Sequence, residues 1–297
     1  MNALASSALA ATGSIEPAAC AAIGRAATLA LYDELALAPK PGLVSFVDSG
    51  SHCDMDARTF MRSLFALRHA FPRFVALGAH DAPFAMLEQA GIAAEARMSG
   101  ATGGVNTHRG AIFTLGLLCA AAGQVLRRRE TMSAHGLRTA LRAAWGPALA
   151  ARAHRVSDRV SDRVSESHGA RAARRFGLRS VGAEAADGFP VLFDTTLPAL
   201  RSALRGGLSP ARAHSNALFA TMAVLDDTNL VHRGGIEGLR FAQRAARDYL
   251  AAGGSARVDG EQHAQALHAA FVARNLSPGG AADMLAAACW LHRVCVA

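Results

Sequence analysis

Lysine is almost absent from this chain of 297 residues. Lys40 is the single lysine, and every other side chain among the 31 Lys and Arg residues is arginine. It lies between Pro39 and Pro41, whose fixed φ angles stiffen the loop and keep it out of a helix. A compact, strongly hydrated cation on a stiff loop suits a phosphate. The alternative is that an arginine-rich composition left one lysine by chance on a solvated turn.

Aromatic residues and long apolar runs are also scarce. Aromatics make up 6% of the chain and hydrophobic residues 51%, which is typical of an Ala- and Leu-rich globular protein with a sizeable core. The longest apolar stretches, such as Ala111 to Gly123, fall short of the roughly 20 residues of a membrane helix, so we expect no transmembrane span. Residues 1–14 lack the basic segment of a signal peptide. We expect them to form a flexible tail, and residues 15–297 to form one helical domain.

The few cysteines do not form a disulfide or metal pattern. There are five, an odd number with no C-x-x-C spacing, at Cys20, Cys53, Cys119, Cys289 and Cys295. Buried, reduced thiols in a cytoplasmic protein are the interpretation that this usage favours.

The net charge of +8 raises the question of nucleic-acid binding. The arginines are scattered through helical segments with almost no aromatics between them, and only Arg127 to Arg129 form a run. A small polyanionic substrate accounts for the charge equally well. We therefore expect no nucleic-acid partner.

Apolar residues recur at helical spacing along most of the chain. The segments are 15–38, 56–77, 84–98, 109–122, 134–144, 147–176, 191–205, 210–225, 235–252, 261–274 and 279–295. This pattern predicts an all-α protein, a single large helical domain of about ten or more helices joined by functional Gly-rich loops. The breaks rich in Gly, Pro, Asp or Ser are 39–50, 100–104, 177–190, 206–210, 226–235, 253–260 and 277–280. A tandem repeat, R-V-S-D, R-V-S-D, R-V-S-E at 155–166, is interpreted as a local expansion of a solvated helix without function.

The first break places an imidazole and two carboxylates just ahead of a helix. They are His52, Asp54 and Asp56. Asp54 alone could cap the helix, because a carboxylate there accepts backbone N–H bonds. The pair also suits Mg²⁺, which commonly binds one or two carboxylates together with substrate phosphates.

The second break is a glycine-rich loop, residues 99–110, that leads into a helix starting near His108. Glycines such as Gly103 and Gly104 let backbone N–H groups approach a ligand, and Arg109 adds a forked donor. The loop lacks the G-K-[ST] ending of a Walker motif. We expect an anion site here, although Thr107 alone could serve as an N-cap.

The last two breaks repeat this chemistry. Residues 226–235 combine two acids, an amide, an imidazole, an arginine and two glycines, where an Asx turn is the structural alternative. Residues 277–283 begin with Ser277 and Pro278, a favourable helix start, followed by Gly279 and Gly280, which weaken a helix. Either a neighbouring element packs against these glycines, or a ligand touches the backbone while Asp283 points toward the same place.

Taken together, these stretches resemble a known enzyme family. They read L-x-P-K-P-G-L-V, G-S-H-x-D-M-D, G-V-N-T-H-R-G-A-I-F, D-D-T-N-L-V-x-R-G-G and S-P-G-G-x-A-D-M-L-A, with Gly188-Phe189-Pro190 in addition. The chain resembles the triphosphoribosyl-dephospho-CoA synthases over residues 20–296. Ser45 and Ser51 are similar to the branch that serves malonate decarboxylase, since the citrate lyase branch usually has Asp and Ala there. Arg109 replaces a lysine more typical of its motif.

The resemblance implies a reaction and its site. The 2′-hydroxyl of 3′-dephospho-CoA attacks C1′ of ATP and adenine leaves, so that an inverting displacement gives the precursor of a prosthetic group for an acyl carrier subunit. Carboxylates are expected to take the hydroxyl proton, and His52 or His108 to protonate adenine. The residues assigned to proton transfer are Glu34, His52, His108 and Asp283. Those assigned to substrate binding are Lys40, Gly103, Gly104, Asn106, Thr107, Arg109, Asn229, Arg233, Gly279 and Gly280, and those assigned to Mg²⁺ are Asp54, Asp56, Asp226 and Asp227.

Two other functions remain as alternatives. A metal-dependent hydrolase of the nucleotide N-glycosidic bond would use the same groups but let water attack. A non-catalytic helical protein that binds RNA or an acyl carrier protein would not need four polar Gly-rich breaks. An all-α prenyl-transferring enzyme is disfavoured, because no D-D-x-x-D motif occurs. The oligomeric state, including a homo-oligomer, is left open.

Overall fold

The computed structural model describes residues 16–158 and 175–296. Every regular element in these ranges is a helix and none is a strand, so the prediction of an all-α domain is confirmed. The first part contains α1 (Pro17–Ala36), α2 (Ala57–Leu67), α3 (Ala70–Ala79), α4 (Phe84–Thr102), α5 (Arg109–Arg127) and α6 (Ala134–Asp158). The second contains α8 (Val181–Ala186), a π-helical turn (Leu192–Thr196), α9 (Leu197–Arg205), α10 (Pro210–Met222), α11 (Thr228–Ala251), a 3₁₀ turn (Gly254–Ala256), α12 (Gly260–Val272) and α13 (Gly279–Val294). The predicted tail and residues 159–166 of the repeat lie outside the described residues.

Helix α5 is the core helix of the domain. It is long and apolar enough to cross a membrane, yet most of it is buried against other helices of the protein, α3, α6 and α13 among them. The approach of α3 is close: a Cβ on Gly78 would lie 1.8 Å from the carbonyl oxygen of Ala120, and one on Gly123 would lie 2.0 Å from that of Val75. Glycine at both positions therefore lets the two backbones touch. The apolar character of α5 is explained by its place at the centre of the core.

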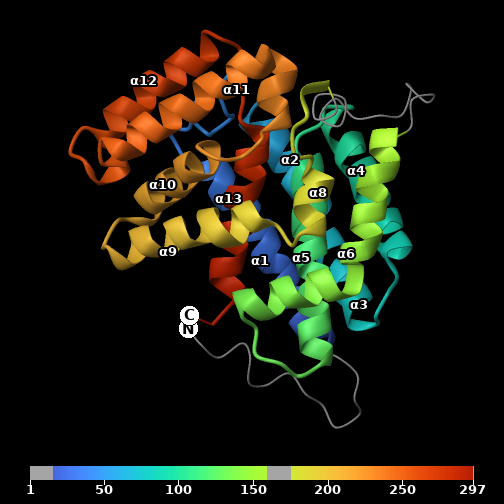
Figure 1. The fold of residues 1–297 in the computed structure, drawn as a ribbon. Coiled ribbons are helices and arrows are strands. Elements are labelled where there is room, and N and C mark those ends of the chain that lie inside the picture. The colour runs from blue at the N-terminus through green and yellow to red at the C-terminus, as the bar shows by residue number, and fades with distance from the viewer. Residues whose placement is uncertain (1–15, 159–174, 297) are drawn as a thin grey trace.

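Helices α1 and α13 run through the middle of the molecule, side by side (Figure 1). Helices α2 to α6 lie on one side of this pair, and α9 to α12 lie on the other (Figure 1). The pair also contacts α5. This arrangement brings together the last turns of α1, the start of α5 and the start of α13, which carry Glu34, His108 and Asp283 respectively.

Two predicted helix boundaries were wrong. The segment 56–77 forms two helices, α2 and α3, separated at Arg68 and His69. The predicted break before Pro147 does not occur, because α6 continues through this proline. Buried side chains on either side, Trp145 and Leu149, hold the helix, and the Trp145 indole N–H donates to the carbonyl oxygen of Ala82 at 3.0 Å. Tertiary packing thus outweighs the helix-breaking tendency of one proline.

Two predicted loops contain helical residues. Helix α8 lies inside the predicted break 177–190. Helix α11 begins at Thr228, so most of the predicted loop 226–235 is helical, and only Gly235 breaks the helix, with φ 63° and ψ −167°. Glycine is favoured at residue 235 by this backbone conformation and not by a close neighbour, because a Cβ there would meet no atom within 4 Å.

Candidate functional site

The single lysine is buried and ion-paired. Lys40 is 1% exposed, and its Nζ donates to the carbonyl oxygen of Glu34 at 2.7 Å and also to the Glu34 carboxylate. Burial lowers the pKa of Lys40, and the negative charge of Glu34 opposes this. The expectation of a solvated turn is therefore wrong, and so is the picture of a strongly hydrated cation. The ammonium instead neutralises a buried carboxylate, and removing either partner would leave an uncompensated charge.

His108 is buried at the start of α5 with one ring nitrogen unused. Its Nδ1 lies 2.6 Å from Ser63 Oγ, which accepts a hydrogen bond from the Thr107 hydroxyl at 2.7 Å. Nε2 has no hydrogen-bond partner among the residues that the structure describes. Burial, together with the charge of Lys40, lowers the pKa of His108 to about 3, so the ring is neutral at pH 7. Thr107 is not the N-cap of α5, because its hydroxyl orients Ser63 instead.

Asp283 reaches from α13 to the start of α5. Its carboxylate accepts a hydrogen bond from the backbone N–H of Ala111, and a Cβ on Gly110 would lie only 1.9 Å from Asp283 Oδ2. Burial raises the pKa of Asp283 well above its usual range, and the negative charges of Glu34 and Asp227 raise it further. Three carboxyl groups thus share one buried region, and this environment favours the neutral form of Asp283.

Asp227 caps two helices at once. Its Oδ1 accepts from the backbone N–H of Asn229 at 2.9 Å at the start of α11, and its Oδ2 accepts from that of Ala281 at 3.0 Å at the start of α13. Burial raises the pKa of Asp227 to about 6, although these backbone donors lower it. Side chains also explain the paired glycines, since a Cβ on Gly279 would lie 2.7 Å from Asn229 Nδ2 and one on Gly280 3.1 Å from Asp227 Oδ2. Of the two interpretations of this pair, packing by a neighbouring element is the one observed.

His52 and Arg233 connect helix α11 with the loops around residues 51–52 and 275–277. Arg233 donates to His52 Nδ1 at 2.9 Å and to the carbonyl oxygen of Ser51 at 2.8 Å, and His52 Nε2 lies 3.0 Å from Ser277 Oγ. A guanidinium can only donate, so Nδ1 must accept and Nε2 carries the proton that it donates to Ser277. Burial and the charge of Arg233 lower the pKa of His52 to about 4. Both side chains are engaged in holding the 50–52, 233 and 275–277 segments together.

The four predicted metal ligands do not converge. Asp56, not Asp54, caps α2, because its Oδ1 accepts from the N–H and the hydroxyl of Thr59, each at 2.8 Å. Asp226 accepts from the backbone N–H of Arg179 at 3.0 Å. Asp54 is exposed and lies 3.7 Å from His52 Nδ1. In the part of the chain that the structure describes, these acids form no group of three whose ligand atoms lie within 4.8 Å of one another.

The glycine-rich loop lies at the surface beside the buried centre. Gly103 and Gly104 have φ angles of 68° and 91°, and a Cβ on either would meet nothing within 4 Å. Backbone conformation, and not a close neighbour, therefore requires glycine there. Asn106 Oδ1 accepts from the N–H of Arg109 at 3.2 Å, and Arg109 Nε donates to Glu95 at 3.0 Å. These groups are exposed and reachable by a ligand.

The structure thus brings Glu34, Lys40, His108 and Asp283 into one buried region, beside Asp227. The glycine-rich loop is joined to this region through Thr107 and Ser63, whereas no hydrogen bond or ion pair joins the His52–Arg233 pair to it among the described residues. Ser63 was missed by sequence reasoning. It is fully buried on the inner face of α2, and a small hydroxyl within an amphipathic helix gives no pattern that would single it out.

Comparison with known proteins agrees with this geometry. Residues 20–296 match the family model CitG, described as ATP:dephospho-CoA triphosphoribosyl transferase. The chain is 41% identical to a protein of Azotobacter vinelandii strain DJ, covering 89% of this chain and 88% of that protein. It is 38% identical to one of Stutzerimonas stutzeri strain A1501, covering 94% and 93%, and 40% identical to one of Pseudomonas aeruginosa strain UCBPP-PA14, covering 89% and 88%. All three relatives are named probable 2-(5''-triphosphoribosyl)-3'-dephosphocoenzyme-A synthase.

No solved structure matches the chain. The family match extends over nearly all of the described domain and includes every residue of the buried region. The chain therefore belongs to the CitG family of ATP:dephospho-CoA triphosphoribosyl transferases.

Proposed function

We propose that this protein transfers the 5-triphosphoribosyl group of ATP to the 2′-hydroxyl of 3′-dephospho-CoA and releases adenine. In this step the bond from the acceptor 2′-oxygen to C1′ forms and the bond from C1′ to adenine breaks. The hydroxyl proton passes to a base on the protein, and adenine gains a proton from an acid. The observation that carries the proposal is the buried group of Glu34, Lys40, His108 and Asp283, in which a lysine-paired carboxylate and a carboxyl group with a raised pKa lie in one region.

We assign the acid to Asp283 and the base to Glu34. Burial and the neighbouring carboxylates raise the pKa of Asp283, which favours its protonated form, while the hydrogen bond from the N–H of Ala111 fixes its orientation. His52 and His108, with pKa values of about 4 and about 3, carry almost no imidazolium at pH 7 and are poor proton donors. The free Nε2 of His108 is instead available to hydrogen-bond the bound nucleotide. A buried carboxylate nearby also favours the oxocarbenium character that develops at C1′.

The triphosphate fits the exposed rim formed by residues 103–109. Backbone N–H groups at the start of α5 and the positive end of its dipole favour an anion there. Arg109 is 51% exposed, and its surface pair with Glu95 is weak enough to be exchanged for a phosphate. Lys40 and Arg233 act indirectly in this proposal, because both are already held by protein groups.

Three of the four predicted Mg²⁺ ligands already accept hydrogen bonds from the protein: Asp56, Asp226 and Asp227. Asp54 is exposed and lies 3.7 Å from His52 Nδ1, so solvent and a metal that arrives with the triphosphate can reach it. When bound, the ion would neutralise charge on the phosphates. Asp54 is therefore the predicted ligand that the geometry favours.

The acceptor fits a groove along the outer face of α2. This groove, of about 710 Å³, combines apolar side chains with arginines and extends to Ala101, two residues before the glycine-rich rim. Its lining includes Phe46, Met61 and Phe65 together with Arg58, Arg62 and Arg68. Phe46 and Phe65 are 49% and 56% exposed, and the Phe46 ring lies 5.7 Å from that of Tyr32, so the groove offers aromatic surface to a ligand. The diphosphate of dephospho-CoA complements the arginines, and its pantetheine arm complements the apolar floor.

The product is proposed to serve malonate decarboxylase, whose acyl carrier subunit would receive the finished group. Support comes from Ser45 and Ser51, the two positions similar to that branch. Ser51 donates to the carbonyl oxygen of Leu276 at 2.6 Å, and Ser45 Oγ accepts from the N–H of Val47 at 3.1 Å. An alanine at Ser51 could not make this bond between the first and last breaks.

One assay separates transfer from hydrolysis. Purified protein is incubated with ATP and Mg²⁺, with and without dephospho-CoA, and free adenine is measured over time. Transfer predicts adenine release only when the acceptor is present. Release at the same rate without acceptor would support the nucleotide hydrolase instead.

A further inference from the structure

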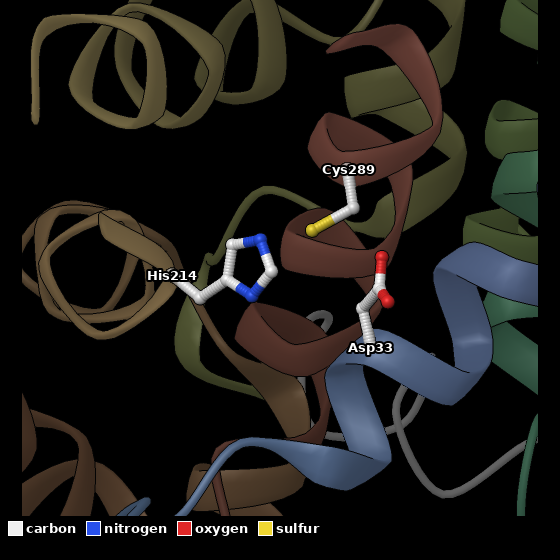
Figure 2. A group of neighbouring side chains, drawn as sticks. All are labelled: Asp33, His214 and Cys289. Atoms are coloured by element: carbon white, nitrogen blue, oxygen red, sulfur yellow. The ribbon is translucent and has the colours of Figure 1, made fainter. Parts of the chain in front are cut away.

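A carboxylate, an imidazole and a thiol converge away from the residues assigned to the reaction. Asp33 of α1, His214 of α10 and Cys289 of α13 point toward one another from three helices (Figure 2). One ligand atom from each lies within 4.8 Å of the other two. In residues 16–158 and 175–296 this is the one group of three or more His, Cys, Asp or Glu side chains that meets this distance.

Each member is available as a ligand. Cys289 is 2% exposed and is not in a disulfide. His214 is directed at the other two side chains, and an imidazole nitrogen that carries no proton can bind a metal. Asp33 pairs with Arg293 through Oδ2, and its Oδ1 makes no hydrogen bond or ion pair to the described residues. A carboxylate that binds a metal with one oxygen is commonly held by a hydrogen bond at the other.

We propose that Asp33, His214 and Cys289 form a zinc-binding site. Thiolate, imidazole and carboxylate are the three ligand types that Zn²⁺ accepts, whereas a thiol is unsuited to Mg²⁺. Ligand atoms around a tetrahedral zinc lie roughly 3.5 Å apart, as follows from bond lengths of about 2.0 to 2.3 Å. Small side-chain rotations would therefore close the present arrangement. The fourth position would hold water, because three protein ligands leave it open.

The zinc site would stabilise the relative positions of α1 and α13 without contacting the substrate. Asp33 precedes Glu34, and the two side chains diverge: Glu34 binds Lys40, while Asp33 binds Arg293. Cys289 lies on the same helix as Asp283. A metal that joins α1, α10 and α13 would thus fix the two helices that carry the proposed base and acid. Binding requires the Cys289 thiol to lose its proton, because the thiolate is the form that binds a metal, so zinc uptake releases protons.

Cobalt substitution tests the proposal on the full-length protein. The protein is stripped with a chelator and titrated with Co²⁺, whose thiolate charge-transfer and tetrahedral ligand-field absorption report the ligands directly. We expect saturation at one ion per chain, loss of the charge-transfer band in Cys289→Ser, and its retention in Cys53→Ser, which removes an exposed cysteine. Absence of the band in the parent, or its survival in Cys289→Ser, would overturn the proposal.

A second variant keeps the proposal testable even if Cys289→Ser does not fold. Arg293→Gln keeps all three ligands but removes the partner of Asp33. The charge-transfer band should persist, while Zn²⁺ affinity measured by competition with a chromophoric chelator falls by about 10- to 100-fold. Zn²⁺ should also raise the Tm of the parent, and to a smaller extent that of Arg293→Gln. Unchanged zinc affinity in Arg293→Gln would contradict the role assigned to Asp33.

Discussion

Asp283 occupies the space beside Gly110 that any side chain at residue 110 would need, because a Cβ there would lie 1.9 Å from Asp283 Oδ2. The same carboxylate accepts the N–H of Ala111. Residue 110 must therefore be glycine for the proposed acid to reach the start of α5, and the two positions form one unit of the site.

Gly110→Ala should displace the Asp283 carboxylate. We expect kcat to fall by about 10²-fold, since a shift of about 1 Å in a catalytic group has effects of this size. Gly100→Ala is the matched control, because Gly100 lies in a helix and a Cβ there meets nothing within 4 Å. Steady-state kinetics of both variants checks this, and equal kcat values for the two would argue against the Gly110 relationship.

Asp283→Asn keeps the shape of the side chain and its acceptor oxygen for Ala111 but removes the transferable proton. We expect kcat to fall by about 10² to 10⁴-fold with little change in the KM for ATP. Circular dichroism and thermal unfolding should show an intact fold. Parental kcat in this variant would remove Asp283 as the acid.

Lys40→Met should destabilise the protein through Glu34. An unpaired buried carboxylate costs about 3–5 kcal/mol of unfolding free energy, which urea titration can measure. The double variant Lys40→Met with Glu34→Gln removes both charges and should recover much of this loss. A double variant as unstable as Lys40→Met alone would contradict the pairing as the cause.

Lys40→Arg keeps the charge but adds volume at a residue that is 1% exposed. The bulkier, planar guanidinium cannot reproduce the paired contacts of the ammonium with Glu34. Reduced stability and a weaker apparent affinity for ATP are expected. Parental stability and turnover in this variant would mean that the single lysine is an accident of composition.

Acid should destabilise the protein through two buried histidines. The pKa values of His52 and His108 are lowered to about 4 and about 3 in the folded state, against about 6.5 when unfolded. Below pH 6.5 the unfolded chain binds more protons, so the stability that these groups contribute is present above pH 6.5 and is lost as pH falls toward 4 and 3. Urea unfolding at pH 7 and pH 5 should show a smaller loss in His108→Gln than in the parent. A parallel loss in both would contradict the neutral state of His108.

The groove on α2 makes a prediction for the acceptor alone. Arg62→Ala should raise the KM for dephospho-CoA several-fold and leave the KM for ATP unchanged, because a guanidinium–phosphate contact is lost on one substrate only. Arg240→Ala, at an exposed arginine on α11, is the control. An equal rise in both KM values would contradict a contact of Arg62 with dephospho-CoA alone.

Sequence motifs pointed to several residues of the buried region without predicting their contacts. They singled out Lys40, His108 and Asp283, because a lone lysine and polar residues clustered in Gly-rich breaks can be recognised in the sequence. They did not show that Lys40 is buried, that Asp56 caps α2, or that Asp227 caps two helices, since these depend on which elements meet in space. Because Asp227 caps two helices and does not lie in a simple loop, Asp227→Asn is expected to lower stability as well as turnover.

The fate of the three phosphates of ATP distinguishes transfer of the triphosphoribosyl group from every reaction at phosphorus. The protein is incubated with ATP, Mg²⁺ and 3′-dephospho-CoA, and all products are identified by mass spectrometry. We expect one adenine released for each dephospho-CoA consumed, and a product that carries the ribose with all three phosphates. Formation of ADP or pyrophosphate in proportion to turnover would contradict this expectation.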